Sequence, residues 1–358
     1  ADRHLMNREE RLQALFAKLE ERELTALLIS HPPDLNYLFG FTGSAGRALL
    51  SEGRARLFVD SRYTVQAREE TANCEILETV DPVNQVRQIL RRGSRLGIQG
   101  DHLSYCEARE IIERLVPDTA VRPEKGLLSE LRIRKSQAEI GRIRAACQKA
   151  LKAWQRFLSD WDRQGTEMQT AALLDYTCRC EGAGRNAFET IVAGGARSAL
   201  PHAAPGPARL NPDEPLLVDF GIVLESYCSD LTRCILPPGR HDAAEIYRIV
   251  EEAQQAAVAC IKPGISTLEV DRAARNVIRD AGYGDCFGHG TGHGIGLELH
   301  ELPRISFRGE QDLEPGMVFT VEPGIYLPGR FGIRLEEVVA VTDRGAEILS
   351  LPQPGRLS

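Results

Sequence analysis

Three of the chain's eight histidines lie within residues 289–300, in a segment that is rich in glycine. Each glycine costs a regular helix about 1 kcal/mol relative to alanine, and it lets the backbone approach a ligand closely. A single histidine is most often a packing residue, but three on such a segment indicate metal binding or proton transfer. We therefore expect Gly288–Glu301 to form the floor of a site. Its spacing is not the His-Glu-x-x-His of single-zinc peptidases, so further metal ligands must be carboxylates from elsewhere.

The first carboxylates lie in two apolar segments that are typical of strands. Leu216–Ile222 contains Asp219, and Tyr227–Ile235 contains Asp230. In an antiparallel hairpin whose turn is centred on Leu224-Glu225, these two acids face each other with their Cβ atoms about 5 Å apart. Two like charges at that distance destabilise the fold unless a cation lies between them. Two exposed hairpin acids are the alternative, although exposed acids rarely interrupt strands as apolar as these.

A second pair of strand-like segments repeats the pattern. Val318–Tyr326 contains Glu322, and Gly332–Val341 contains Glu336, with turn residues between them. Four acids and one or more histidines on such strands would form an oxygen-rich site for two divalent ions. Two ions about 3.5–4 Å apart can share a bridging water, lower its pKa and stabilise both ends of a hydrolytic displacement.

The ordered set of four acids and one histidine resembles the five-ligand dinuclear centre of the M24 peptidases, which have the pita-bread fold. The resemblance is closest to the Xaa-Pro branch of that family, aminopeptidase P and prolidase. It rests on six phrases that run in order from about residue 185 to the end of the chain. They are Val218–Gly221, Ser229–Arg233, His289–Leu297, His300–Pro303, Glu322–Tyr326 and Gly332–Glu336.

The resemblance implies that these five residues are the metal ligands. Asp230 and Glu336 are expected to bridge both ions, Asp219 to hold one ion, and His293 with Glu322 to hold the other. Glu322 is also expected to be the general base, which takes a proton from the bridging water.

The same resemblance assigns residues to the substrate side. His289 and His300 are expected to face the substrate, one lining the pocket and one donating to the tetrahedral intermediate, and His202 matches the family's outer histidine. Tyr326 and Arg334 are expected close to the metals, Tyr326 as a substrate-binding residue and Arg334 as a catalytic one. Because a proline amide has no N–H, general peptidases lose a hydrogen bond there, and a pocket shaped to the pyrrolidine ring makes up the difference.

Composition excludes several classes of protein. The net charge of −7 argues against nucleic acid as a partner, because a phosphate-binding face needs clustered Lys and Arg. No run of about 18 apolar residues predicts a membrane span, and the charged N-terminus, Ala1–Arg8, lacks the apolar core of a signal peptide. Nine scattered cysteines suit reduced thiols. We therefore expect a cytoplasmic protein.

At 358 residues the chain is long for a single core, so we expect an α/β protein of two domains. Residues 7–127 alternate helix-like and strand-like segments, and Phe41–Gly46 with Asp60–Thr64 resembles the creatinase-like N-terminal α/β domain. Residues 128–358 are expected to form the pita-bread α+β domain, which opens with a long helix over Ser136–Asp160.

The leading interpretation is an aminopeptidase P, which releases the first residue from proline-containing peptides of the form Xaa-Pro-Yaa. The alternative is a prolidase restricted to Xaa-Pro dipeptides, which must hold the proline carboxylate with a fixed cation, usually arginine. Between His300 and Glu322 the basic residues are Arg304 and Arg308, on a short segment without an insertion. We therefore expect an open far side that admits longer peptides.

Three other interpretations are less favoured. A methionine aminopeptidase shares the fold and the ligands but typically lacks a creatinase-like N-terminal domain. A creatinase-like amidinohydrolase works without metal and does not retain the five ligands. A non-catalytic pita-bread domain that only binds peptides has no need of the acids, and this chain has all of them.

The ligand types also bear on the metal. Four carboxylates against one imidazole favour a hard ion such as Mn²⁺ over zinc, and the family's usual dependence on manganese or cobalt agrees. We expect two divalent ions per chain, Mn²⁺ before Co²⁺, Zn²⁺ or Fe²⁺. The resemblance further implies a homodimer in which the N-terminal domain of one chain borders the active site of the other.

Overall fold

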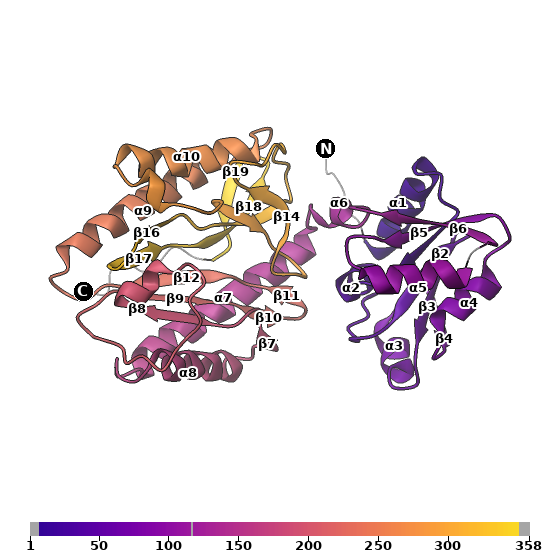
Figure 1. The fold of residues 1–358 in the computed structure, drawn as a ribbon, viewed down its shortest axis with the longest axis horizontal. Coiled ribbons are helices and arrows are strands. Elements are labelled where there is room, and N and C mark those ends of the chain that lie inside the picture. The colour runs from indigo at the N-terminus through magenta and orange to yellow at the C-terminus, as the bar shows by residue number, and fades with distance from the viewer. Residues whose placement is uncertain (1–6, 116, 351–358) are drawn as a thin grey trace. The chain divides into compact units, whose positions relative to one another are not determined.

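A computed structural model describes residues 7–115 and 117–350 of the protein. The chain forms two compact units that divide between Arg132 and Ile133 (Figure 1), whereas the sequence placed the boundary between residues 127 and 128. Most of the segment considered above as a signal peptide, residues 1–6, lies outside the described residues. None of the helices within the described ranges is long and apolar enough to cross a lipid bilayer.

The N-terminal unit is a six-stranded sheet with the strand order β4-β3-β2-β1-β5-β6. Strand β2 runs antiparallel to both of its neighbours, whereas β1 with β5, β5 with β6 and β3 with β4 are parallel. The predicted α/β class of this unit is confirmed. Its strands are β1 (Ala26–Ile29), β2 (Arg47–Ser51), β3 (Arg54–Val59), β4 (Glu75–Glu78), β5 (Ser94–Gln99) and β6 (Thr119–Glu124). Its helices are α1 (Arg8–Glu21), α2 (Pro32–Phe39), α3 (Thr64–Glu70), α4 (Pro82–Ile89), α5 (Tyr105–Leu115) and α6 (Ser129–Arg132).

The C-terminal unit places two helix pairs against several small antiparallel sheets. The helices are α7 (Gln137–Asp160), α8 (Glu167–Cys180), α9 (His241–Cys260) and α10 (Thr267–Asp280), with the short 3₁₀ helices η1 (Gly195–Ala199) and η2 (Gly284–Cys286). Helices α7, α8 and α10 each begin with a capping box, at Ser136, Thr166 and Ser266, which satisfies orphan backbone donors of the first turn. Figure 1 shows α9 and α10 on one side of the strands and α7 and α8 on the other.

Two sheets of this unit carry the acidic strands. One has the order β12-β9-β8 and the other the order β14-β13-β15-β18-β19, and smaller groups β11-β10-β7 and β16-β17 lie beside them. In chain order, the strands are β7 (Arg185–Asn186), β8 (Ile191–Gly194), β9 (Leu216–Phe220), β10 (Ile222–Leu224), β11 (Tyr227–Cys228), β12 (Leu231–Ile235), β13 (Gly292–Gly294), β14 (Glu301–Ile305), β15 (Val318–Val321), β16 (Gly324–Leu327), β17 (Phe331–Arg334), β18 (Glu337–Thr342) and β19 (Gly345–Ile348). This arrangement of helices and antiparallel sheets agrees with the predicted pita-bread class.

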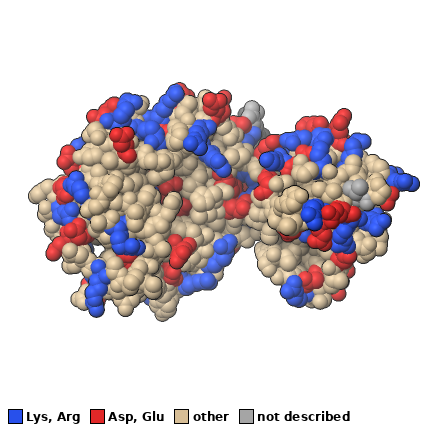
Figure 2. Space-filling view, in the orientation of Figure 1, with Lys and Arg blue, Asp and Glu red and all other residues tan. Residues whose placement is uncertain are grey.

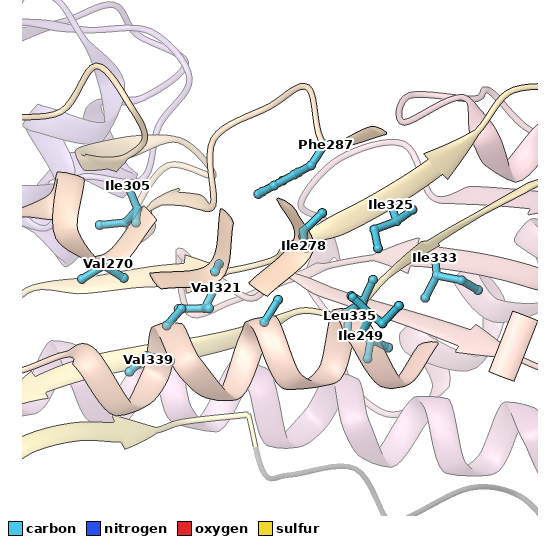
Figure 3. Close-up of a cluster of buried hydrophobic side chains, with 14 of the residues drawn as sticks. Ile249, Val270, Ile278, Phe287, Ile305, Val321, Ile325, Ile333, Leu335 and Val339 are labelled. Atoms are coloured by element: carbon cyan, nitrogen blue, oxygen red, sulfur yellow. The ribbon is translucent and has the colours of Figure 1, made fainter. Parts of the chain in front are cut away.

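A large apolar core fixes the strands against helices α9 and α10 (Figure 3). It buries side chains from both the helices and the strands, among them Ile249, Val270, Ile278, Phe287, Val321, Ile325, Ile333, Leu335 and Val339. A second core packs α7 and α8 against β9 and includes Trp154, Phe157, Leu174, Val218 and Phe220. The acidic side chains therefore lie on strands that are held by packing on both sides.

The register of the first acidic hairpin differs from the predicted one. Leu224 pairs with Tyr227, so the turn is Glu225-Ser226, both with positive φ of 47° and 72°. Asp219 consequently lies opposite Thr232 and not opposite Asp230, and that prediction was wrong. Two-residue hairpin turns usually have the sequence Asn-Gly or Asp-Gly, and Glu-Ser is not one of these signatures. The error is two residues, and a shift by two keeps each side chain on its face, so both acids still point to the same side.

Charged residues are mixed on the surface in view. Figure 2 shows acidic and basic side chains interspersed over each unit. The described residues on this face therefore present no continuous basic surface of the kind that a phosphate backbone requires.

Candidate metal centre

The five expected metal ligands come from five separate places in the chain and meet in one cavity. Its volume is about 350 Å³. Asp219 is in β9, Asp230 lies just before β12, His293 is in β13, Glu322 follows β15, and Glu336 lies between β17 and β18. All five line the cavity, together with His202, His289, His300 and Arg334.

The ligand atoms are close enough for one or more cations. Asp230, His293 and Glu336 each offer one ligand atom, and these three atoms lie within 4.8 Å of one another. His293 Nε2 is 3.5 Å from Oδ2 of Asp230 and 3.3 Å from Oε1 of Glu322. His293 Nδ1 lies 3.1 Å from the carbonyl oxygen of Gly294, so a proton on Nδ1 would leave the Nε2 lone pair directed at the acids.

The backbone around His293 requires glycine on both sides. A Cβ atom on Gly292 would lie 1.8 Å from the carbonyl oxygen of Thr320, and one on Gly294 would lie 2.1 Å from that of Leu302. Both distances are far below van der Waals contact. The Gly-His-Gly triplet therefore lets the histidine strand lie directly between its two neighbours.

Asp219, Asp230 and Glu336 are buried, and Glu322 is partly buried. Asp230 is 5% exposed and Glu336 is 1% exposed. Burial raises the pKa of Asp230 well above its ordinary value, and the carboxylates of Asp219 and Glu322 raise it further. Burial, followed by the charges of Asp230 and Glu322, likewise raises the pKa of Glu336. Such shifts express the cost of gathering four carboxylates in one site that is shielded from water.

The hydrogen bonding of two carboxylate oxygens bears on whether metal ions fit this cluster. Within residues 7–115 and 117–350, Oδ1 of Asp219 and Oε1 of Glu336 are buried and have no hydrogen-bond donor. Buried polar atoms are almost always paired, so these two indicate a partner that the polypeptide does not supply. A divalent cation would supply it, because hard cations bind carboxylate oxygens.

Arg334 lines the cavity and contacts the acidic cluster directly. Its Nη2 donates to Oδ2 of Asp219 at 2.6 Å, its Nη1 to the hydroxyl of Tyr326 at 2.8 Å, and its Nε to Oγ1 of Thr232 at 3.1 Å. Thr232 in turn donates to Oε2 of Glu336 at 2.7 Å. One arginine thus orients two of the acids.

Tyr326 was expected to bind the substrate, and the structure places it behind the cavity wall. It is 7% exposed, and it is absent from the described residues that line the cavity. Its hydroxyl lies 2.8 Å from Nε2 of His289 and 2.8 Å from Nη1 of Arg334. Burial raises its pKa to about 12, so the hydroxyl keeps its proton and can donate it to His289.

The three remaining histidines also line the cavity. The ring of His300 is 4.3 Å from that of His293, in an edge-on arrangement. Burial, and then the charge of His293, lower the pKa of His300, which keeps it neutral with one N–H to donate. His202 is exposed, and both ring nitrogens of His289 have partners, Gly290 O at 2.8 Å and the Tyr326 hydroxyl.

Two threonines that the sequence analysis did not single out position the ligands. Thr320 Oγ1 accepts from the backbone N–H of His293 at 3.1 Å and donates to Oε1 of Glu322 at 3.0 Å. Thr232 does the same for Arg334 and Glu336. Both stand inside apolar strands beside the acids, and a fully buried hydroxyl at such a place is the signal that could have revealed them.

The chain matches two known families along most of its length. Residues 141–343 match metallopeptidase family M24, and residues 11–134 match the creatinase/prolidase N-terminal domain. The Xaa-Pro dipeptidase of Pyrococcus furiosus is 36% identical over 346 residues, which cover 95% of this chain and 97% of that protein.

Solved structures are similar over nearly the whole chain. An Xaa-Pro dipeptidase from Bacillus anthracis has a TM-score of 0.92 and 36% identity, covering 98% of this chain and 99% of that one. An X-Pro aminopeptidase from Thermotoga maritima has a TM-score of 0.86 and 37% identity, covering 94% and 98%.

Proposed function

The chain belongs to metallopeptidase family M24 and carries a creatinase/prolidase N-terminal domain, and from this premise we propose that it is an Xaa-Pro dipeptidase. The observation that carries the proposal is the cluster of four acids, three of them buried, and His293 in one cavity, with two carboxylate oxygens that lack donors among the described residues. The ligands we propose are Asp219, Asp230, His293, Glu322 and Glu336, with Asp230 and Glu336 shared between two divalent ions. Bound ions would supply Lewis acidity and lower the pKa of a water molecule.

The residues of the chain itself would handle the proton transfers. Glu322 accepts a proton from the attacking water, because its carboxylate is at the cavity surface and is oriented by Thr320. His300 donates to the oxygen of the scissile carbonyl as negative charge develops there. His202 and His289 line the remaining wall, where the pyrrolidine ring would pack.

Arg304 favours a dipeptidase over an aminopeptidase P. In the β13–β14 pair, Arg304 is the register partner of His293, so their side chains lie on the same face of the sheet. Arg304 is exposed, and its positive charge adds to the effects that lower the pKa of His300. An exposed arginine on the same face as His293 fits the free carboxylate of an Xaa-Pro dipeptide. The open far side expected from the sequence stays a prediction.

Aminopeptidase P is the second candidate, and one observation favours it. The Thermotoga maritima structure with 37% identity is described as an X-Pro aminopeptidase. The proposed Mn²⁺ as native ion, the homodimer and the cytoplasmic location stay predictions.

The decisive measurement is kcat/KM for an Xaa-Pro dipeptide and for an Xaa-Pro-Yaa tripeptide with the same first residue. We expect the dipeptide to be preferred. Arg304→Met should lower kcat/KM for the dipeptide by about 10- to 100-fold, the size of a charged hydrogen bond, and should leave the tripeptide nearly unaffected. Arg308→Met is the matched control from the same segment and should change neither. Preference of the unmodified enzyme for the tripeptide would make it an aminopeptidase P.

A further inference from the structure

Two side chains on helix α10 form an ion pair that reaches beyond the helix. Nε and Nη2 of Arg275 donate to the two carboxylate oxygens of Asp271, each at 3.0 Å. Asp271 is fully buried and the side chain of Arg275 is 24% exposed. We call Asp271 and Arg275 the α10 pair. Its bidentate geometry fixes the plane of the guanidinium group and directs the other N–H groups away from the helix.

The α10 pair holds alternate residues of the loop that carries His289. Arg275 donates to the carbonyl oxygens of Phe287 at 2.9 Å and of His289 at 2.8 Å. Asp271 Oδ1 accepts from the backbone N–H of Thr291 at 3.1 Å and from its hydroxyl at 2.9 Å. Three residues of the loop are therefore tied to one pair, and His289 is the middle one.

Ring contacts complete the fixation of His289. The Arg275 guanidinium lies over the ring of Phe287, 4.3 Å from its centroid. The Phe287 ring meets the His289 ring edge-on, with centroids 5.0 Å apart. The Tyr326 hydroxyl contacts Nε2 of the same imidazole. The ring is therefore held by Tyr326 and by Phe287, and Phe287 is itself held by Arg275 of α10.

The same device recurs at the loop that carries His202. Nε of Arg197 donates to both carboxylate oxygens of Glu167, at 3.0 and 2.9 Å. Glu167 is buried at the first position of helix α8, and we call these two residues the α8 pair. Its carboxylate also accepts from the backbone N–H of Gly194 at 3.1 Å and of Gly206 at 3.0 Å.

The α8 pair thus spans the loop from end to end. Gly194 and Gly206 bracket His202, and Nη2 of Arg197 donates to the carbonyl oxygen of Ala204 at 2.7 Å, two residues beyond the histidine. The segment between these glycines consists of the 3₁₀ helix η1 and irregular chain, and the α8 pair adds to the partners of its backbone polar groups.

We propose that the α10 pair and the α8 pair are positioning devices for the peptidase site, one for His289 and the other for His202. Neither pair lines the cavity among the described residues, so each acts through its loop and not by touching substrate. Misplacing a substrate-contacting group by about 1 Å costs up to about 10²-fold in rate. The inference rests on the proposed function, because it assumes that these histidines face the substrate.

Ordinary surface pairs provide the contrast. Arg248 and Glu252 on α9 form an ion pair with the same spacing of four residues, and both side chains are about half exposed. A pair of this kind contributes little to stability and holds no loop of the site. Arg248→Met is therefore the matched control for Arg275→Met.

The test is a set of double-mutant cycles measured as kcat/KM on whichever of the two peptide lengths the unmodified enzyme cleaves faster. Arg275→Met and Arg197→Met should each lower kcat/KM by about 10- to 100-fold, with metal content unchanged. Arg275→Met should have little further effect once His289 is alanine, and Arg197→Met little once His202 is alanine. In the crossed combinations the effects should multiply to within about twofold, as for independent sites.

A second measurement does not depend on activity. The imidazole resonances of His289 and His202 in the metal-free protein should shift with Arg275→Met and Arg197→Met respectively, and should stay in place with Arg248→Met. Arg275→Lys should shift the His289 resonance less than Arg275→Met does and should recover part of kcat/KM. Lysine keeps the positive charge and a donor but cannot form the bidentate contact of the guanidinium group.

The outcomes separate the two proposals. If Arg275→Met lowered kcat/KM as much in the His289→Ala background as in the unmodified enzyme, or Arg197→Met as much in the His202→Ala background, the positioning role would be overturned. Unmoved histidine resonances would overturn it as well. A tripeptide preference of the unmodified enzyme would overturn the dipeptidase assignment alone, since the cycles remain readable on that substrate.

Discussion

Each unit of this protein buries carboxylates, but the charge of Asp34 in the N-terminal unit is compensated differently from that of the acidic cluster in the C-terminal unit. In the N-terminal unit Asp34 is completely buried, and both of its oxygens have donors: Arg132 Nη1 on Oδ1 at 2.8 Å and Gln99 Nε2 on Oδ2 at 2.6 Å. His31 and His102 offer ligand atoms within 4.8 Å of it. Because the carboxylate is already bonded at each oxygen, this group is a structural pair and not a metal site.

The C-terminal unit gathers four carboxylates around one arginine that bonds directly to one of them, Asp219. Two buried oxygens, on Asp219 and Glu336, have no donor within the part of the chain that the structure describes. Burial alone therefore does not mark a functional site here. The uncompensated charge marks it, since the fold retains a cost that only a ligand can offset.

The largest effect is expected from removing a shared ligand. Asp230→Ala or Glu336→Ala should release both ions and lower kcat/KM by at least about 10⁴-fold, because the metal chemistry then fails altogether. Metal analysis after dialysis checks the cause. Retention of about two ions per chain in either variant would contradict the shared role and weaken the contrast between the two units.

A smaller effect is expected from a residue that touches the substrate but not the metals. His300→Ala should lower kcat by about 10²–10³-fold, the size of one lost transition-state donor, while both ions stay bound. Rates and metal content measured on the same preparation decide this. Loss of metal instead would mean that the roles of His293 and His300 are exchanged.

Replacing Asp34, the buried carboxylate of the N-terminal unit, should affect stability and not activity. Asp34→Asn removes the negative charge from a buried pair, and it should lower the free energy of unfolding by about 1–3 kcal/mol, with kcat and metal content unchanged. Denaturant unfolding together with steady-state kinetics tests this. A change in metal content would contradict the interpretation of the Asp34 group as structural.

The smallest effect is a difference in pH dependence. In metal-free protein the pKa values of Asp230 and Glu336 are raised, so their protonated forms stabilise the fold, and that stability is lost as pH rises above about 4 toward the raised pKa values. The Tm of the metal-free protein should therefore fall with rising pH in this range. In metal-loaded protein the fall should vanish, and a parallel fall would argue against these acids as ligands.

Much of the fold and of the candidate site followed from residue patterns. Glycines on both sides of His293, and single acids within apolar strands such as Leu216–Phe220, have few explanations besides a site with a cation. The two-domain α/β prediction and the family are confirmed. The assignment of individual ligands and catalytic roles stays a proposal, although the structure brings these residues into one cavity.

Other features had no local signal. The turn at Glu225-Ser226 lacks the residues that usually mark a two-residue turn, so the register of its hairpin was misjudged by two positions. Thr232 and Thr320 look like ordinary strand residues, and their importance depends on which carboxylate lies within reach of each hydroxyl.

The sequence by itself determined the chemistry of this protein: which carboxylates and imidazoles are available, and that their strands are too apolar to leave acids in water. Tertiary structure alone decided the pairings between distant segments. Arg304 lies beside His293 because β14 pairs with β13 in one particular register, and Arg275 reaches the carbonyl of His289 because α10 packs against that loop. Backbone register and helix packing are set by the whole core, so they cannot be predicted from any one segment of the sequence.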